Sequence, residues 1–312
     1  MLRLRAMTTV ERADGRRETA TERVGALGDS MRDRCLRAGL EALARVNALW
    51  RLNFSIRGHI GERGVVVPLV RGEGIQLVRG DERWMFDLLR GVLRQRAGAF
   101  IDVGANLGQT LLKVKAIDPD RVYYGFEPNP SAVSYCRELV RVNTFAHATI
   151  VPVGLSSGTD VVMLFAKAET DPSASLVAGF RRASRYSGAQ PVSVHTGDAV
   201  LERLEIADVA VIKIDVEGAE LDVLAGFTRT LTRHRPVVLC EVLPVYDVES
   251  PEGRLRLGRQ QQLVQLLQAT SYAIWRVESA GELSRVPDFG VHADIRQSNY
   301  LFAPLEARPT AD

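Results

Sequence analysis

The stretch with the most chemical information covers residues 100–110, which read FIDVGANLGQT. An apolar run ends in an acid, turns through two glycines and opens a predicted helix. Glycine lets the backbone approach a ligand without a Cβ in the way, and the following helix N-terminus presents free N–H groups to negative charge. Asp102 would repel a pyrophosphate but attract an ammonium group. A ligand with an amino-acid end carries both charges, and S-adenosylmethionine has such an end.

A second carboxylate follows one predicted strand later, in the sequence FEPNP of residues 126–130. Glu127 lies where a carboxylate accepts hydrogen bonds from both ribose hydroxyls of a nucleoside. NAD and S-adenosylmethionine sites share this feature, but a dinucleotide loop reads G-x-G-x-x-G. Gly104 and Gly108, with Asn106 between them, lack that pattern, so the sequence favours S-adenosylmethionine, and an NAD-linked oxidoreductase is the alternative. The predicted cofactor-binding residues are Asp102, Gly104, Ala105, Asn106, Gly108, Thr110, Glu127 and Asn129.

The second informative stretch covers residues 209–220, VAVIKIDVEGAE. Lys213 lies inside an otherwise apolar predicted strand, where an unpaired ammonium would be costly, so it must reach a carboxylate or a cleft. Its candidate partners are Asp215, Glu217 and Glu241, the last at the end of the next predicted strand. Lys213 is one of four lysines among 40 basic residues. The other three, Lys113, Lys115 and Lys167, are expected at solvent-exposed positions.

The carboxylates after the fourth and fifth predicted strands suit a proton-accepting role. The family resemblance given below implies methyl transfer to a hydroxyl, and in-line transfer of this kind needs the hydroxyl held close to the sulfonium methyl and a base for the proton. We expect Asp215, with Glu241 or Glu217, to orient or deprotonate this hydroxyl. Lys213 would fix these carboxylates and tune their charge. The predicted catalytic residues are Lys213, Asp215, Glu217 and Glu241.

Two alternatives to this base are open. Asp215 and Glu241 could instead ligate a divalent metal ion that lowers the pKa of the hydroxyl. Two or three carboxylates at strand ends do not establish a metal site, and we predict no metal ligands. His195 is a competing base, although a histidine beside apolar residues is more often packed or on the surface.

Together these motifs resemble the FkbM family of S-adenosylmethionine-dependent methyltransferases. The resemblance rests on the glycine loop, FEPNP, the sequence KIDVEGAE from Lys213, and Arg235-Pro236 leading into Glu241, and it covers residues 100–304. It implies a Rossmann-like, seven-stranded and mostly parallel sheet with an antiparallel last strand. It also implies methyl transfer to an oxygen of a small molecule or glycan, such as a sugar of a surface polysaccharide or a secondary metabolite.

Composition narrows the remaining function classes. The formal net charge of +2 disfavours a nucleic-acid substrate, whose binders are usually strongly basic. No apolar run reaches the length of a membrane span, and the three cysteines, Cys35, Cys136 and Cys240, form no disulfide framework. We therefore expect a cytoplasmic enzyme of open oligomeric state. A cofactor-binding module that has lost catalysis is the other alternative, and it would be expected to lack the residues named above.

The elements that must position these residues follow an α/β pattern. From residue 99 onward, apolar runs alternate with helical patterns, as in a doubly wound parallel sheet. The predicted strands are 99–103, 122–126, 149–153, 209–214, 237–242, 272–277 and 299–303, and the predicted helices are 108–117, 130–143, 217–226 and 256–268.

A long insertion separates the third and fourth of these strands. It is expected to contain strands at 161–165 and 192–195 around the polar stretch 170–190, and insertions of this length are usually functional or mobile. The segment 171–176, followed by residues 180–182, fits two interpretations equally well: a lid whose hydroxyls and guanidinium groups hold an oxygen-rich acceptor, or an exposed polar loop. Asp198 is the expected N-cap of the helix that follows.

The N-terminal part is predicted to form a helical and β-hairpin cap. Residues 31–52 have the apolar spacing of an amphipathic helix, and residues 64–70 and 75–78 read as two strands joined by a glycine turn. Asp81 is the predicted N-cap of a helix with Trp84, Met85, Leu88, Leu89 and Val92 on its apolar face. The predicted division is a leader at 1–30, the cap at 31–98, the methyltransferase domain at 99–306 and a tail at 307–312.

Overall fold

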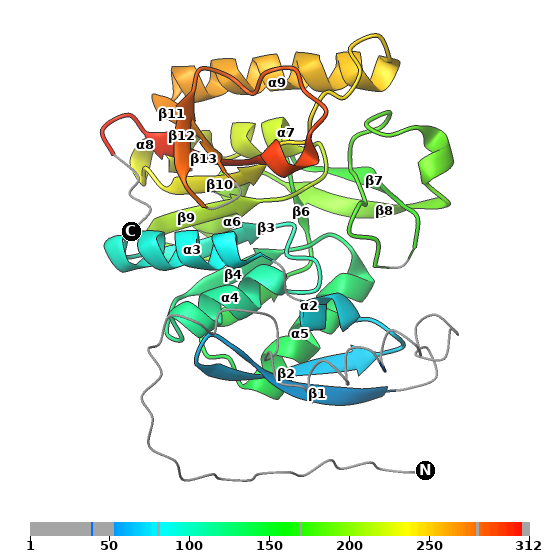
Figure 1. The fold of residues 1–312 in the computed structure, drawn as a ribbon, viewed down its shortest axis with the longest axis vertical. Helices are drawn as coiled ribbons and strands as arrows, with labels where there is room; N and C mark the ends of the chain where they lie inside the picture. The colour runs from blue at the N-terminus through cyan, green and yellow to red at the C-terminus, as the bar shows by residue number, and fades with distance from the viewer. Residues whose placement is uncertain (1–38, 40–52, 80–81, 169, 279–280, 308–312) are drawn as a thin grey trace.

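The computed structural model describes residues 39, 53–79, 82–168, 170–278 and 281–307 (Figure 1). Several predictions lie outside the described residues. They are the leader at 1–30, the helix at 31–52 apart from residue 39, the cap residue Asp81 and nearly all of the tail. The fold is therefore described from residue 53 onward.

An eight-stranded sheet forms the centre of the molecule, in the order β12-β11-β13-β10-β9-β3-β4-β5. The five strands from β10 to β5 are parallel, whereas β13 runs antiparallel to both of its neighbours. All seven predicted strands and the antiparallel last strand are confirmed, and β12 is an eighth strand that was not predicted. The strands are β3 (Ala99–Val103), β4 (Tyr123–Phe126), β5 (Ala148–Val151), β9 (Val209–Ile214), β10 (Val237–Glu241), β11 (Tyr272–Val277), β12 (Leu283–Val286) and β13 (Asn299–Pro304).

Helices cover both faces of this sheet (Figure 1). Consecutive residues of a strand face opposite sides, so Phe100 packs in one apolar cluster and Ile101 in the other. Strands that are buried on both faces read as continuous apolar runs, which is why the sequence revealed them. One cluster contains residues of α3 (Arg83–Gln95), α4 (Gln109–Ile117) and α5 (Pro130–Asn143); the other contains residues of α6 (Gly197–Arg203), α7 (Glu220–Ala225), α8 (Thr228–Arg233) and α9 (Pro251–Ala269).

The N-terminal hairpin differs from the prediction in its strands. β1 (Asn53–Ile60) pairs with β2 (Arg63–Val70), so the partner of β2 precedes it in the chain. The predicted strand 75–78 is wrong, because this segment forms the short helix α2 (Ile75–Arg79). A short apolar run fits a buried helix as well as a strand. Gly74, with a φ of +91°, turns the chain away from β2 just before α2.

The insertion folds into a small sheet of its own, in the order β6-β8-β7. Both predicted strands are confirmed as parts of β7 (Asp160–Ala166) and β8 (Gly188–His195). The short strand β6 (Gly154–Leu155) precedes β7 and pairs with β8, and the short helix η2 (Ala183–Arg185) lies between β7 and β8. The predicted N-cap of α6 is wrong. Thr196 caps this helix, while the carboxylate of Asp198 accepts hydrogen bonds from the backbone N–H groups of Arg229 and Thr230 in α8.

The two helices around the candidate carboxylates also differ in their limits. Helix α7 begins at Glu220 rather than at residue 217, because Glu217 and Gly218 have left-handed φ values of +53° and +109°. Helix α9 begins at Pro251, five residues before the predicted start, and the side chain of Ser250 caps it by accepting from the N–H of Gly253. Glu217 therefore lies in a turn at the end of β9.

Lys115 contradicts the expectation of a solvent-exposed lysine. It is fully buried, and its ammonium donates to the backbone carbonyls of Pro119, Arg121 and Ala146 at 3.1, 2.7 and 2.6 Å. An ammonium has three donors and no acceptor, so three converging carbonyls satisfy it completely. Lys115 thus joins α4 to the chain segments that precede β4 and β5.

We expect Lys115→Met to lower the free energy of unfolding by about 3 kcal/mol, because three converging carbonyls lose the buried ammonium that donates to them. Urea denaturation measures this change. Lys113→Met is the control, since Lys113 pairs with the exposed Glu82 and its loss should cost less than about 1 kcal/mol. Equal losses in the two variants would contradict the role of the three carbonyls.

Candidate active site

The predicted site residues meet at the carboxyl ends of the parallel strands, where open α/β sheets bind ligands. A cleft that is open to solvent lies at this edge. Segment 171–176 of the insertion supplies Asp171, Pro172, Ala174 and Leu176 to its lining. Six of the predicted site residues also line it: Gly104, Asn106, Glu127, Asn129, Asp215 and Glu217.

The glycine loop is in backbone contact with the end of β9. Gly104 has a φ of +81°, and a Cβ at this position would collide with the carbonyl oxygen of Asp215. Gly108 is different, because its missing Cβ makes room for Leu139 and Cys136 of α5. Gly104 therefore sets the shape of the cleft, whereas Gly108 serves the packing of α4 on α5.

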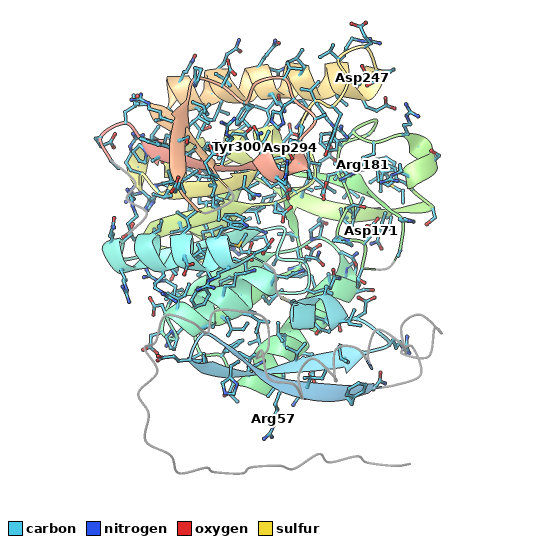
Figure 2. The ribbon with its side chains drawn as sticks, viewed as in Figure 1. Arg57, Asp171, Arg181, Asp247, Asp294 and Tyr300 are labelled. Atoms are coloured by element: carbon cyan, nitrogen blue, oxygen red, sulfur yellow. The ribbon has the colours of Figure 1, made fainter. Side chains whose placement is uncertain are left out.

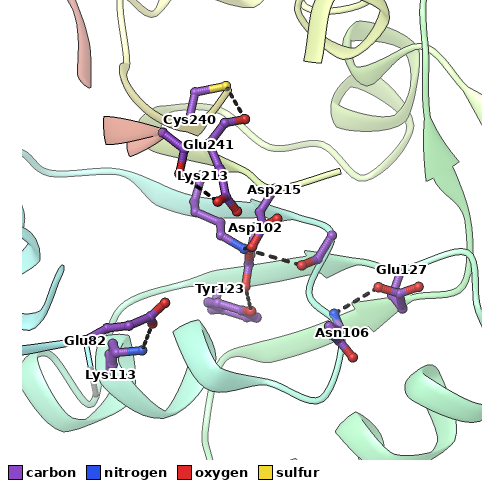
Figure 3. A network of polar contacts seen from close by, with 12 residues as sticks. Glu82, Asp102, Asn106, Lys113, Tyr123, Glu127, Lys213, Asp215, Cys240 and Glu241 are labelled. Carbon is purple, nitrogen blue, oxygen red and sulfur yellow. Dashed lines mark hydrogen bonds and ion pairs between the residues drawn. The ribbon is translucent and has the colours of Figure 1, made fainter. Parts of the chain in front are cut away.

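Glu127 is held in a fixed orientation by the backbone. Its two carboxylate oxygens accept hydrogen bonds from the N–H groups of Asn106 and Asn129, both at 2.9 Å (Figure 3). Burial raises the pKa of Glu127 to about 7, against the opposing effect of these two hydrogen bonds. One carboxylate thus joins the glycine loop to the segment after β4.

Asp102 lies beneath the loop and does not line the cleft. The Tyr123 hydroxyl donates to its Oδ2 at 2.5 Å, and the Lys213 ammonium lies 3.4 Å from its Oδ1 (Figure 3). The three side chains share one face, because Asp102 and Lys213 are direct neighbours on β3 and β9. Burial raises the pKa of Asp102 despite the Lys213 charge. With an exposed fraction of 0%, Asp102 cannot contact a ligand in this structure. Its ammonium partner is Lys213, whereas the sequence suggested the ammonium group of a ligand.

Lys213 joins two carboxylates and the glycine loop. Besides Asp102, its ammonium lies 3.3 Å from Oδ2 of Asp215 and 3.4 Å from the carbonyl oxygen of Gly104. Burial opposes the charge on Lys213, but Asp102 and Asp215 outweigh it and raise the pKa above its usual value. The structure therefore pairs Lys213 with one of its three expected partners and adds Asp102, which the sequence did not suggest.

Asp215 and Glu241 form a second pair of acids. The side chain of Asp215 is 39% exposed and reaches the cleft, whereas Glu241 is largely buried and accepts a hydrogen bond from the Ser298 hydroxyl at 2.8 Å. Burial raises the pKa of Glu241 to about 8, and the neighbouring Asp215 charge adds to this rise. One carboxylate is thus available to a ligand, and the other is poised to hold a proton.

Glu217 connects the cleft to the insertion. Its carboxylate forms an ion pair with Arg181, and its carbonyl accepts from the Ser175 hydroxyl at 2.7 Å. Burial raises the pKa of Glu217 to about 6, although the Arg181 charge opposes the rise. The Phe180 ring packs against Gly218, where a Cβ would collide with it. The expected lid is therefore fastened to the turn after β9.

The other predicted residues lie outside the lining of the cleft. Ala105, Gly108 and Thr110 belong to the glycine loop and the start of α4, and all three are buried. His195 pairs through its backbone with Leu155 of β6. Glu220 accepts from the N–H of Gly218, as expected of a residue that stabilises a helix start. Sequence reasoning missed Tyr123 and Ser298, since nothing in a strand or loop sequence identifies the partner of an isolated hydroxyl.

A metal site has no support from the residues that the structure describes. Among them, no group of three or more histidine, cysteine, aspartate or glutamate side chains could hold a metal ion. The space between Asp102 and Asp215 contains the Lys213 ammonium. The described helices also include none that is long and apolar enough to cross a membrane.

Comparison with known proteins decides the family. The family model for the methyltransferase FkbM domain matches residues 102–272, more than half of the chain. The chain belongs to the FkbM methyltransferase family. This membership confirms the resemblance and sets aside the oxidoreductase alternative. The matched region of this FkbM methyltransferase contains the glycine loop, Glu127, Lys213, Asp215 and Glu241.

Two curated relatives are similar to this FkbM methyltransferase. The hexuronic acid methyltransferase AglP of Haloferax volcanii is 31% identical over 134 residues, which cover 42% of this chain and 50% of the relative. The 2-O-methyltransferase NoeI of Sinorhizobium fredii is 28% identical over 173 residues, covering 50% and 67%. The chain thus matches about half the length of the first relative. A solved FkbM methyltransferase from Methylobacillus flagellatus has 18% identity and a TM-score of 0.39, over 66% of this chain and 43% of that one.

We expect Tyr123→Phe to lower the free energy of unfolding by about 2 kcal/mol, because the buried Asp102 carboxylate loses a charge-assisted hydrogen bond. Denaturant titration measures the loss. Tyr124→Phe, on the same strand and half-buried, is the matched control and should change stability by less than about 0.5 kcal/mol. An unchanged Tyr123→Phe variant would show that Lys213 alone stabilises Asp102.

Proposed function

We propose that the protein is an S-adenosylmethionine-dependent O-methyltransferase that acts on a hydroxyl of a sugar-containing acceptor. The observation that carries this proposal is the position of Asp215. Its carboxylate is paired with the Lys213 ammonium, and Asp215 lines the same cleft as Glu127 and the glycine loop. A proton acceptor and a nucleoside-binding carboxylate thus face one space.

The residues of the cleft fit a nucleoside cofactor. Each oxygen of Glu127 accepts one backbone N–H and keeps a further lone pair for a ribose hydroxyl. Gly104 leaves the backbone open to close approach, and Asn106 and Asn129 line the same wall. S-adenosylmethionine, when bound, supplies an electrophilic methyl group. We assign to Asp102, Ala105, Gly108 and Thr110 the role of shaping this wall from beneath.

The proton of the acceptor hydroxyl is proposed to pass to Asp215. Lys213 keeps Asp215 oriented, since its ammonium lies 3.3 Å from Oδ2 of this carboxylate. Glu241 shares the proton with Asp215, since burial beside that residue raises its pKa to about 8. Glu217 lines the acceptor side and is held by Arg181. Positioned proton transfer of this kind typically contributes about 10²- to 10⁴-fold to a rate.

The proposed acceptor class is supported by the relatives. One is named for methylating a hexuronic acid and the other for 2-O-methylation. A hydroxyl of a glycan or of a glycosylated small molecule is consistent with the names of both relatives. The cleft beside Asp215 is open to solvent, so a large acceptor can reach it. The proposal places the enzyme in the modification of a polysaccharide or of a secondary metabolite.

We expect Asp215→Asn to reduce methyl transfer by about 10²-fold or more, because an amide cannot accept the hydroxyl proton. Transfer of a radiolabelled methyl group to a panel of methyl glycosides measures turnover, and calorimetry with S-adenosylhomocysteine measures cofactor affinity, which should change little. Asp222→Asn, on α7 and paired with Arg259, is the control and should retain activity. Near-normal turnover of Asp215→Asn would remove this residue from the mechanism.

The rate is expected to rise with pH through about 8. Below this value Glu241 holds a proton, since burial raises its pKa to about 8, and a protonated Glu241 cannot share the proton that Asp215 receives from the acceptor. Glu241→Gln should abolish the rise in rate near pH 8. Ser298→Ala should move it to higher pH, because the Ser298 hydrogen bond opposes the rise in the pKa of Glu241. Profiles of kcat/KM against pH test all three expectations, and a profile that is flat from pH 7 to 9 in the parent enzyme would contradict them.

A further inference from the structure

Two arginines lie side by side next to Glu217. Arg181 extends from the insertion, where Figure 2 labels it, and forms an ion pair with Glu217. Arg256 extends from α9 and is 9% exposed; its guanidinium donates to the Phe180 carbonyl at 3.0 Å. The guanidinium of Arg256 also lies over the rings of Phe180 and Tyr246, 4.7 and 5.1 Å from their centroids. Burial lowers the pKa of Arg256, and the charge of Arg181 lowers it further.

The positive charge of this arginine pair is only partly compensated. Within the described part of the chain, Glu217 is the one carboxylate ion-paired with Arg181, and no carboxylate lies within ion-pair distance of Arg256. Glu217, whose own pKa is raised to about 6, is thus the carboxylate in direct contact with the pair, while the charges of Asp171 and Glu252 act on Arg181 and Arg256 from beyond ion-pair distance. A buried charge without a counter-charge is costly, so this arrangement favours an anionic ligand.

Unused hydrogen-bond donors support the same conclusion. The Nε atoms of Arg181 and Arg256 are buried without a hydrogen-bond partner, and so is Nδ1 of His292. His292 belongs to the same neighbourhood, since its carbonyl accepts from the Tyr246 N–H at 3.1 Å. The Nε–H and Nη–H groups of a guanidinium form the edge that binds carboxylate or phosphate with two parallel hydrogen bonds.

Tyr246 is the solvent-exposed member of this group of residues. It is 44% exposed and has a left-handed φ of +61°, which is rare for an aromatic residue and is concentrated at functional sites. The charges of Arg256, Arg181, Glu241 and Glu217 all act on its hydroxyl, so Tyr246 lies near both the arginine pair and the acids of the site. A ligand that contacts Tyr246 is therefore also near the proposed base.

We propose that Arg181 and Arg256 bind an anionic group of the acceptor, a carboxylate or a phosphate on a polyhydroxyl molecule, and hold one of its hydroxyls toward Asp215. This inference rests on the proposed function and deepens it by naming the acceptor class. Entry of the anion displaces Glu217 from Arg181. The acidic group is not itself methylated; it determines which acceptors bind.

The test uses protein saturated with S-adenosylhomocysteine and two matched pairs of probes. Methyl glucuronide is compared with methyl glucoside, and glucose 6-phosphate with glucose, by ligand-observed NMR titration. We expect at least one anionic probe to bind about tenfold more tightly than its neutral counterpart, and the pair that shows this difference distinguishes carboxylate from phosphate.

Variants then locate the anion. Arg181→Gln and Arg256→Gln should each abolish the preference without changing affinity for S-adenosylhomocysteine. Glu217→Gln should strengthen binding of the anionic probe, because it removes the competing carboxylate. Arg254→Gln is the matched control, since Arg254 is exposed on the same helix and should retain the preference. If Arg256→Gln does not fold, as judged by its thermal transition, Arg181→Gln decides alone.

Equal binding of charged and neutral probes, or no binding of either anionic probe, would overturn the inference. A preference that persists in the folded arginine variants would do the same. Loss of S-adenosylhomocysteine affinity in these variants would assign the arginines to the cofactor and also overturn it. Failure of the parent protein to bind S-adenosylhomocysteine would instead reject the proposed function, so the two failures are distinguishable.

Discussion

The burial of one ammonium between two carboxylates governs the architecture of the site. Lys213 lies between Asp102 under the glycine loop and Asp215 at the cleft. Neither Lys213 nor Asp102 is stable there as an isolated charge, because burying an unpaired charge is costly. The pairing forces β3 and β9 to be neighbours in this register and leaves Asp215 as the member that reaches the cleft. Tyr123 completes the arrangement by donating to Asp102.

The cleft is built from two halves with different physical character. The wall formed by the glycine loop and Glu127 is held by backbone bonds from Gly104 and Ala105 to the Phe126 carbonyl and by backbone N–H groups that fix the Glu127 carboxylate, so its shape depends on few side-chain rotamers. The opposite wall is held by side chains of the insertion, through the Arg181–Glu217 ion pair and the Phe180 ring on Gly218. A backbone wall suits a constant ligand such as a cofactor, whereas a side-chain wall suits an acceptor that differs between relatives.

Sequence reasoning recovered the sheet and most of the cleft, because buried parallel strands read as apolar runs and because a lysine inside such a run needs a carboxylate partner. It failed where the answer depended on long-range contacts. Asp102 was assigned to a ligand because Tyr123 gave no sign of facing it, and Arg256, 75 residues beyond Arg181 in the chain, gave no sign of lying beside it. The run 75–78 was too short for its periodicity to separate helix from strand.

The contact between Gly104 and the carbonyl of Asp215 makes the glycine loop and the proposed base a single mechanical unit. The spacing between a cofactor in the loop and the main chain that carries the base is therefore set by backbone atoms that follow two adjacent strands. The insertion lies outside this unit and is attached to it chiefly at residues 217 and 218. Exchange of insertion sequences could then redirect the enzyme to new acceptors while the reaction distance stays the same, which makes the insertion the natural place for redesign.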